Sequence, residues 1–343
     1  MADINVLMVG GRRAGKTSLL AAVKACCDKK QLEKLSVSAV RGADMMNAKV
    51  EEMKGYFTEP QYVDKAIFAP DGSPNDNPAE YEFEVNVNGF NSSYTIGFID
   101  VPGEYYGTNE FGEFTEEEFE EVQHYISDQV QNSQVFLIAV DTPHLMEKMD
   151  KATGYGAGHE WFNRVDQITE FFKRAFQDSQ HRLVLFVPIK CERYLDKMDK
   201  VAACIEKGYA DLLANLTHGP VANLCTVAIA PIISLGGAKF LRFQNNDWHN
   251  VGEYHYHLDT EKRKYDPEYC EQPLMLILQY LLETVKEQKN SQNPVFRWLK
   301  ERFLGQVRIA DLLACEDEIN SLTIIDTQRG YVRLHPKNEG SNH

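Results

Sequence analysis

Residues 10–17 constrain this chain more than any other feature, because they read Gly-Gly-Arg-Arg-Ala-Gly-Lys-Thr and fit the pattern G-x-x-x-x-G-K-[S/T] in full. An apolar run at residues 5–9 precedes them, and Leu19, Leu20 and Val23 follow at helical spacing. A glycine-rich turn between a strand and a helix lets backbone N–H groups converge on phosphate oxygens, beside the positive end of the helix dipole. The motif therefore predicts a phosphate-binding loop at the end of a buried strand.

This geometry gives the side chains of the loop separate tasks. We expect Lys16 to place its ammonium group between the β- and γ-phosphates of a nucleotide, and Thr17 to offer its hydroxyl group to Mg²⁺. The expected nucleotide-binding residues of the loop are Gly10, Arg13, Ala14, Gly15, Lys16, Thr17 and Ser18.

Short apolar runs alternate with helical patterns along the first 285 residues. Further strands are expected at residues 81–87, 94–99, 135–140, 183–188 and 227–233, and helices at residues 18–26, 116–130, 162–176, 200–215 and 274–285. This alternation predicts an α/β fold with a mostly parallel, doubly wound sheet. Residues 81–99 differ, because they alternate, turn at Asn88–Gly89 and run back, which predicts an antiparallel hairpin at one edge of the sheet.

Three stretches, at residues 41–77, 150–159 and 244–272, look like insertions into this pattern. Residues 288–293 are polar and are typical of a linker. We therefore predict one domain over residues 1–287, followed by a linker and a short C-terminal extension over residues 288–343.

Composition limits the partners and the compartment. The chain has 36 Lys and Arg against 51 Asp and Glu, a net charge of −15, which argues against binding to nucleic acid or to an anionic membrane. No apolar run approaches the roughly 18 residues that a membrane helix needs. The first residues lack the pattern of a signal peptide, and the seven cysteines are scattered. We expect a cytoplasmic protein with reduced thiols and no membrane span.

A second motif follows the expected strand at residues 94–99, and it reads Asp100-Val101-Pro102-Gly103-Glu104. An aspartate at the end of a strand beside the phosphate loop can hold Mg²⁺ through a water molecule. The glycine of such a D-x-x-G element can donate its backbone N–H to the γ-phosphate. We therefore expect Asp100 at the metal and Gly103 at the nucleotide.

In order and type, these motifs resemble P-loop GTPases of the translation-factor and Ras-like class, in which the first residue of D-x-x-G is the Mg²⁺-linked aspartate. The insertions and the D-x-P-G-E element are similar to those of bacterial double-GTPase-type proteins. The resemblance covers residues 4–285. It implies a P-loop NTPase fold and a guanine-nucleotide-binding switch that hydrolyses GTP with Mg²⁺. It also implies a protein effector or activator that docks on the switch regions.

In such GTPases a later strand ends in N-K-x-D, whose Lys packs over guanine and whose Asp accepts hydrogen bonds from it. Here residues 189–192 read Ile-Lys-Cys-Glu, so the resemblance assigns Lys190 and Glu192 to the base, while Ile189 lacks the amide that ties this loop to the phosphate loop. The alternative is a surface pair after a buried strand. Ser234 and Leu235 resemble the S-A-x loop that meets guanine O6. ATP stays an alternative to GTP.

The hydrolytic residues also depart from the family pattern. Glu104 stands where a water-orienting Gln is usual, and Arg12 occupies a loop position that is small in Ras-like proteins. We assign catalytic roles to Glu104 and Arg12. Either Arg12 or Arg13 is expected to reach the phosphates, and the alternative is that both arginines are solvated. Slow turnover is expected, and a nucleotide-binding scaffold with negligible hydrolysis is the alternative. Thr58, the only Thr within residues 41–77, is the candidate switch I metal ligand.

The predicted helix after the second motif starts with an acidic run. Thr115 and Glu118 fit a capping box, and five glutamates lie between residues 116 and 121. The run is either a solvated face or a docking surface for a basic partner.

Overall fold

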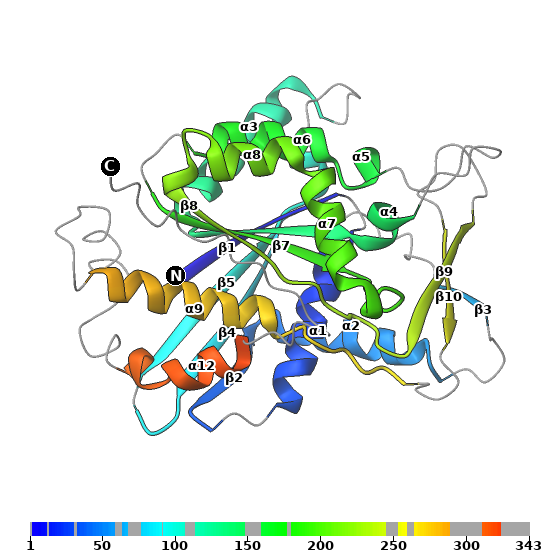
Figure 1. Cartoon of the computed structure of the whole chain (residues 1–343), viewed down its shortest axis with the longest axis horizontal. Coiled ribbons are helices and arrows are strands. Elements are labelled where there is room, and N and C mark those ends of the chain that lie inside the picture. The colour runs from blue at the N-terminus through cyan, green and yellow to red at the C-terminus, as the bar shows by residue number, and fades with distance from the viewer. Residues whose placement is uncertain are drawn as a thin grey trace.

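A seven-stranded sheet runs through the centre of the molecule in the order β2-β4-β5-β1-β6-β7-β8 (Figure 1). Its strands are β1 (Ile4–Val9), β2 (Leu35–Arg41), β4 (Ala79–Val87), β5 (Ser93–Asp100), β6 (Val135–Asp141), β7 (Arg182–Ile189) and β8 (Cys225–Ile229). This computed structural model describes residues 2–11, 14–30, 33–58, 64–67, 77–90, 92–106, 114–147, 159–176, 180–244, 253–258, 264–288 and 311–323. Neighbouring strands from β5 to β8 pair in parallel, and β4 pairs antiparallel with both β2 and β5. The predicted α/β fold with a mostly parallel sheet is confirmed.

The hairpin that the sequence predicts is formed by β4 and β5, and its turn contains Asn88 and Gly89. Its predicted position at the edge of the sheet is wrong, because β2 pairs with the outer side of β4 and forms the edge. Leu35 in β2 is buried and alternates with exposed Ser36 and Ser38, so the strand contributes one apolar face to the core. Pairing with β2 satisfies the backbone groups that an outermost β4 would leave open.

Helices cover both faces of the sheet (Figure 1). One face carries α1 (Lys16–Lys29), α2 (Ala43–Gly55), α9 (Gln272–Gln288) and α12 (Glu316–Thr323). The other carries α3 (Glu116–Asn132), α6 (Val165–Ala175), α7 (Met198–Gly208) and α8 (Ala210–His218). Two short helices, α4 (Thr142–Met146) and α5 (His159–Phe162), lie between β6 and α6.

Successive side chains of the central strands point to opposite faces of the sheet and so contribute to two separate hydrophobic cores. In β1, Val6 and Met8 point to the core beneath α1 and α9, whereas Leu7 and Val9 point to the core beneath α3 and α6. All of these side chains are buried, as expected for parallel strands covered on both faces.

Two predicted helices differ in detail from those observed. The helix expected at residues 200–215 is two helices, because the chain breaks between Gly208 and Ala210. A Cβ at Gly208 would lie 2.4 Å from Nε2 of His159, so a larger residue there would require this ring to shift. The helix expected at residues 162–176 starts at Val165, after α5. The predicted capping box of α3 is confirmed, with Thr115 Oγ1 accepting from Glu118 N–H and Glu118 accepting from Thr115 N–H.

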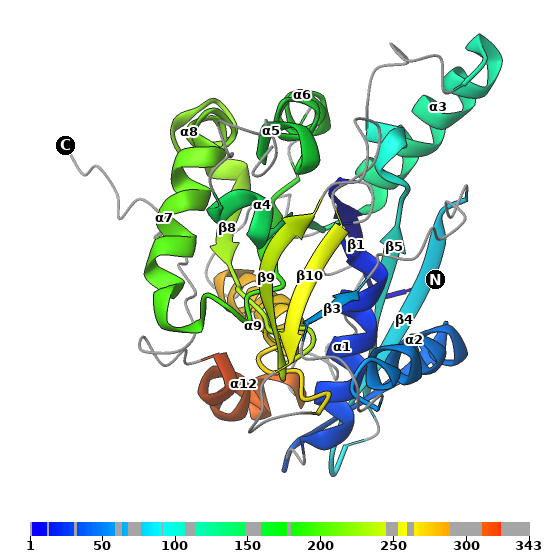
Figure 2. The same cartoon turned by 90° about the vertical axis from the view of Figure 1, so that its right-hand side faces the viewer.

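A separate antiparallel sheet lies beside the main one in the order β3-β10-β9 (Figure 2). It consists of β3 (Asp64–Ile67), β9 (Ala238–Gln244) and β10 (Glu253–Leu258). Two of the three expected insertions, residues 41–77 and 244–272, therefore meet in one small sheet. The third, residues 150–159, lies outside the described residues except for His159.

The described part of the C-terminal extension packs against the body of the molecule. Leu312, Cys315 and Ile319 are buried in the core beneath α9. The carboxylate of Glu318 accepts hydrogen bonds from the backbone N–H groups of Glu33 and Lys34, just before β2. The predicted boundary between residues 287 and 288 stays a prediction. In the described part of the chain, no helix combines the length and apolar character needed to cross a membrane.

Candidate functional site

Polar residues gather where the parallel strands end, at the carboxyl edge of the main sheet. Gly10 follows β1, Asp100 and Asp141 end β5 and β6, and Lys190 follows β7. Because β5, β1, β6 and β7 are consecutive neighbours, these four residues lie along one edge. Ligands of open α/β sheets bind in the crevice outside this edge.

The glycine-rich loop after β1 is held close to neighbouring strands. A Cβ at Gly10 would lie 2.9 Å from the carbonyl oxygen of Ala139 in β6. Gly15 has a φ of +103° and precedes the first residue of α1, and a Cβ there would lie 3.1 Å from Cδ1 of Ile189. Both positions therefore require glycine. Ala14 donates its N–H to the carbonyl oxygen of Gly11 at 3.2 Å, while Arg12 and Arg13 lie outside the described residues.

Lys16, Thr17 and Asp100 meet at the start of α1. Lys16 Nζ donates to the carbonyl oxygens of Gly10 and Gly11 at 3.3 and 3.5 Å, and it lies 3.8 Å from Asp100 Oδ1. Thr17 Oγ1 donates to Asp100 Oδ2 at 2.8 Å. Burial raises the pKa of the Asp100 carboxyl group, and the Lys16 ammonium and the Thr17 hydroxyl oppose that shift.

These oxygens fit a magnesium site. Mg²⁺ prefers carboxylate, hydroxyl and water oxygens, and the Thr17 hydroxyl and the Asp100 carboxylate supply two such groups side by side. A divalent cation would also stabilise the ionised form of a carboxyl group whose pKa burial raises. Thr58, the third expected metal ligand, lies at the exposed end of α2, where its hydroxyl donates to the carbonyl oxygen of Gly55 at 2.9 Å. The described contacts do not bring it to Thr17 or Asp100.

The segment after Asp100 forms the short helix η1 (Gly103–Tyr106). Gly103 is buried and Glu104 is half-buried. The hydroxyl group of Tyr106 donates to the carbonyl oxygen of Met8 at 2.6 Å, which fixes η1 to β1 near the glycine-rich loop. The structure therefore holds Gly103 and Glu104 on a segment that is anchored beside the expected phosphate site.

Glu192 and the Ser234 loop form a second group at this edge. Glu192 Oε1 accepts from the N–H of Leu235 at 2.7 Å and from the hydroxyl of Ser234 at 3.3 Å. The side chain is 1% exposed, and burial raises its pKa while the bonds from Leu235 and Ser234 lower it. Its second oxygen, Oε2, has no hydrogen-bond partner among the described residues.

Lys190 and Glu192 do not form the surface pair that was one interpretation of the sequence. Lys190 Nζ lies 2.5 Å from Asp141 Oδ2, and both side chains are largely buried. Lys190 has a φ of +61°, in the left-handed region that non-glycine residues rarely adopt. The contact between Ile189 and Gly15 joins this loop to the glycine-rich loop by packing, in place of the amide that the sequence lacks.

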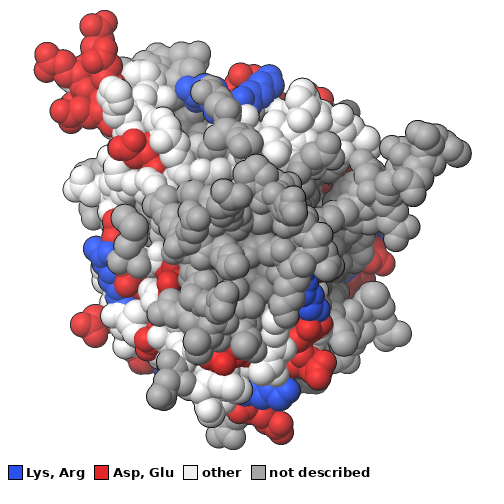
Figure 3. All heavy atoms as spheres, turned by 90° about the vertical axis from the view of Figure 1, so that its left-hand side faces the viewer, with Lys and Arg blue, Asp and Glu red and all other residues white. Residues whose placement is uncertain are grey.

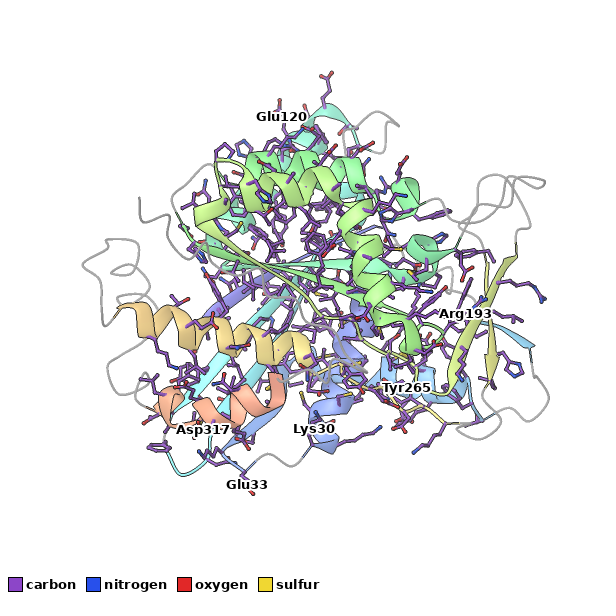
Figure 4. The ribbon with its side chains drawn as sticks, viewed as in Figure 1. Lys30, Glu33, Glu120, Arg193, Tyr265 and Asp317 are labelled. Carbon is purple, nitrogen blue, oxygen red and sulfur yellow. The ribbon has the colours of Figure 1, made fainter. Side chains whose placement is uncertain are left out.

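The small sheet borders the same loop. Arg193, labelled in Figure 4, donates through Nη1 to the carbonyl oxygen of Leu241 in β9 at 2.9 Å, and its guanidinium lies 6.0 Å from the centre of the Phe240 ring. A Cβ at Gly236 would lie 2.1 Å from the carbonyl oxygen of Asp266, so residues 264–268 pack directly on the Ser234 loop.

Sequence reasoning missed Asp141, Asn163 and Arg164. Asp141 ends the buried strand β6 at the site edge, and a carboxylate directly after an apolar strand was a usable signal. Asn163 and Arg164 carry no comparable signal, because they lie in the short connection between α5 and α6. The segment that holds them lies against Gly11, where a Cβ would be 2.1 Å from the carbonyl oxygen of Phe162 and 3.6 Å from Cγ of Arg164.

Acidic side chains project from the first turns of α3. Glu116, Glu117, Glu118, Glu120 and Glu121 are all exposed, and Glu120 points away from the body of the molecule in Figure 4. This part of α3 protrudes from the molecule in Figure 2, and in Figure 3, which is drawn from the opposite side, acidic side chains form the protruding upper corner.

Comparison of the sequence with protein-family models gives no match, and comparison with curated proteins gives none either. The functional assignment therefore rests on the residues at the carboxyl edge of this sheet.

Proposed function

We propose that this chain is a P-loop GTPase-like switch, which binds guanine nucleotide with Mg²⁺ and hydrolyses GTP slowly. The observation that carries the proposal is the meeting of Lys16, Thr17 and Asp100 at the end of two adjacent parallel strands, directly after a complete G-x-x-x-x-G-K-T motif. An ammonium, a hydroxyl and a carboxylate in this order are the groups that hold a nucleotide phosphate and its metal ion.

The start of α1 supports phosphate binding. The first N–H groups of a helix have no acceptor within the helix, and in α1 they belong to Lys16 and Thr17, the last two residues of the motif, and to Ser18, which follows it. Among the described residues, Lys16 Nζ makes long hydrogen bonds to the carbonyl oxygens of Gly10 and Gly11 and an ion pair with Asp100. A phosphate group could replace these polar partners without disturbing the hydrophobic core. Thr17 and Asp100 would hold Mg²⁺, which neutralises phosphate charge when it is bound.

Glu192 supports guanine as the base. Its oxygen Oε2 is buried and has no donor among the described residues, and such a group is costly. The N–H groups of guanine N1 and N2 would satisfy it, whereas adenine has no donor at position 1. Ile189 at the expected Asn position is the reason that ATP remains the alternative.

Hydrolysis is proposed to be slow because Glu104 stands at the water-orienting position and adds negative charge near the phosphates. An activator that supplies an arginine would find the exposed acidic turns of α3 close along the chain to η1. A scaffold with negligible hydrolysis is the outcome if no activator raises the rate.

The test compares wild type with Lys16→Ala and with Lys24→Ala, a matched lysine on the same helix that pairs with Asp28. Binding of GTP, GDP, ATP and ADP with Mg²⁺ is measured by isothermal titration calorimetry, and circular dichroism checks the fold. We expect Lys16→Ala to abolish binding and Lys24→Ala to leave it unchanged. Near-wild-type nucleotide affinity in Lys16→Ala would refute the proposal, and equal affinity for GTP and ATP would refute the guanine preference.

A further inference from the structure

Asp141 accepts bonds from two different segments at the site edge, although it belongs to neither of the two expected binding loops. Its side chain is 2% exposed. Oδ2 accepts from Lys190 Nζ, and Oδ1 accepts from the backbone N–H of His144 at 3.1 Å, at the start of α4. A buried carboxylate persists only with such partners, so the position of Lys190 and the position of Asp141 depend on each other.

Asn163 holds Asp141 from the other side. Its Oδ1 accepts from the N–H of Asp141 at 2.7 Å, and its Nδ2 donates to the carbonyl oxygen of Asp141 at 3.2 Å. Nδ2 also lies 2.9 Å from Nδ1 of His159, one turn earlier along the chain. Asn163 is fully buried, and its amide thus pairs with both backbone groups of one residue in β6.

The segment that carries Asn163 touches the glycine-rich loop. The carbonyl oxygen of Phe162 would lie 2.1 Å from a Cβ at Gly11, so the two backbones are in contact there. Arg164, on the other side of Asn163, has a φ of +51° and directly precedes α6. A continuous set of contacts therefore runs from Lys190 through Asp141 and Asn163 to Gly11.

Lys190 needs such support. It adopts a left-handed backbone conformation that is unfavourable for a lysine, and its Cε lies 3.9 Å from the position of a Cβ on Gly15. The ion pair with Asp141 holds the side chain extended beside the glycine-rich loop. Ile189, which precedes it, has no side-chain amide that could form a hydrogen bond between this loop and the glycine-rich loop.

We propose that Asp141 and Asn163 are positioning residues, which fix Lys190 at the base and lock the base loop to the phosphate loop. This inference rests on the proposed function and assigns the task of the missing Asn in residues 189–192 to residues from two other parts of the chain. Neither residue needs to touch the nucleotide. The polar bridge of Lys190, Asp141 and Asn163 orders both loops before binding, and loss of that order lowers affinity.

The experiment is a double-mutant cycle in nucleotide affinity. Asn163→Ala, Lys190→Met and the double variant are compared with wild type for GDP and GTP, with melting temperature measured in parallel. Thr284→Val in α9 is the control, because Thr284 is also buried and loses one hydrogen bond, to the carbonyl oxygen of Tyr280 at 2.7 Å. We expect Asn163→Ala to weaken both nucleotides by about tenfold and the double variant to lose less than the product of the single losses.

Thr284→Val should lower the melting temperature and leave both affinities unchanged. If Asn163→Ala prevents folding, Asn163→Asp replaces it, since it keeps the acceptor for the N–H of Asp141 and loses the donor to its carbonyl oxygen. The inference is overturned if the Asn163 variant binds like wild type while Lys16→Ala does not bind, or if the losses at positions 163 and 190 multiply independently. Absence of binding in wild type overturns the proposed function and this inference together.

Discussion

His144 is expected to make the stability of this protein depend on pH. Its ring is 1% exposed and is stacked between the rings of Phe162 and Phe243, at centroid distances of 3.9 and 4.3 Å. Burial lowers its pKa from 6.5 to about 4; the nearby Asp141 carboxylate opposes this shift and the Lys190 ammonium adds to it. The folded protein therefore keeps this histidine neutral at pH values where an unfolded chain protonates it.

The direction and size of the effect follow from these two pKa values. As pH falls through 6.5, the unfolded state binds a proton that the folded state does not, so the free energy of unfolding decreases. The full loss, reached near pH 4, is about 3 kcal/mol. Between pH 7.5 and pH 5.5 the contribution of His144 to the free energy of unfolding falls by about 1.3 kcal/mol.

Urea unfolding of wild type and His144→Phe at pH 7.5 and pH 5.5 measures this term. Phenylalanine keeps an aromatic ring in the stack and does not titrate, so the variant should lose about 1.3 kcal/mol less than wild type over this range. His218→Phe, at the exposed end of α8, controls for removal of a histidine from the surface. An identical pH dependence in wild type and His144→Phe would refute the reasoning.

Three further outcomes are expected. Glu192→Ala should weaken the binding of GTP by about 1.5–3 kcal/mol, measured by calorimetry, because a charged hydrogen bond to guanine is lost, and it should leave the binding of ATP unchanged. Equal small effects on the binding of both nucleotides would favour an ATPase. In single-turnover assays, the rate constant for GTP hydrolysis by wild type should be far below about 1 s⁻¹, and it should change in Glu104→Gln and Glu104→Ala. A wild-type rate constant at or above that value would mean that no activator is needed. The same rate constant in Glu104→Ala as in wild type would mean that Glu104 has no catalytic role. Gly10→Ala should destabilise the fold by about 1–3 kcal/mol in urea unfolding, since its Cβ would approach the Ala139 carbonyl oxygen; wild-type stability would contradict that contact.

The sequence predicted the central strands and the proximity of Lys16, Thr17 and Asp100 because both depend on short stretches of chain. Residues 6–9 and 135–140 are continuous apolar runs, which are typical of strands covered on both faces, and the structure has β1 and β6 there. Lys16 and Thr17 are fixed by an eight-residue motif. Asp100 meets them because its strand is the parallel neighbour of β1.

The edge strand and the small sheet could not be predicted in the same way, because they depend on pairing between distant segments. Residues 35–39 of β2 do alternate between apolar residues and serines, so the strand itself carried a signal that was missed, whereas its pairing with β4 could not be read from either segment alone. β3 and β10 come from two separate insertions and meet with β9, so neither insertion alone carries the pattern of a sheet.

The loop after β7, residues 189–192, shows how the two cases combine. Residues 189–192 depart from the expected pattern at Ile189, and from sequence alone this departure predicts a weaker tie between the two loops. In the structure Ile189 packs against Gly15, and Lys190 is paired with Asp141, which Asn163 holds in turn. The three polar residues are separated by 22 and 27 positions along the chain, so no local motif can include them. A residue missing from a motif therefore does not by itself mean that its structural task is unfilled, because packing can bring other residues to the same place.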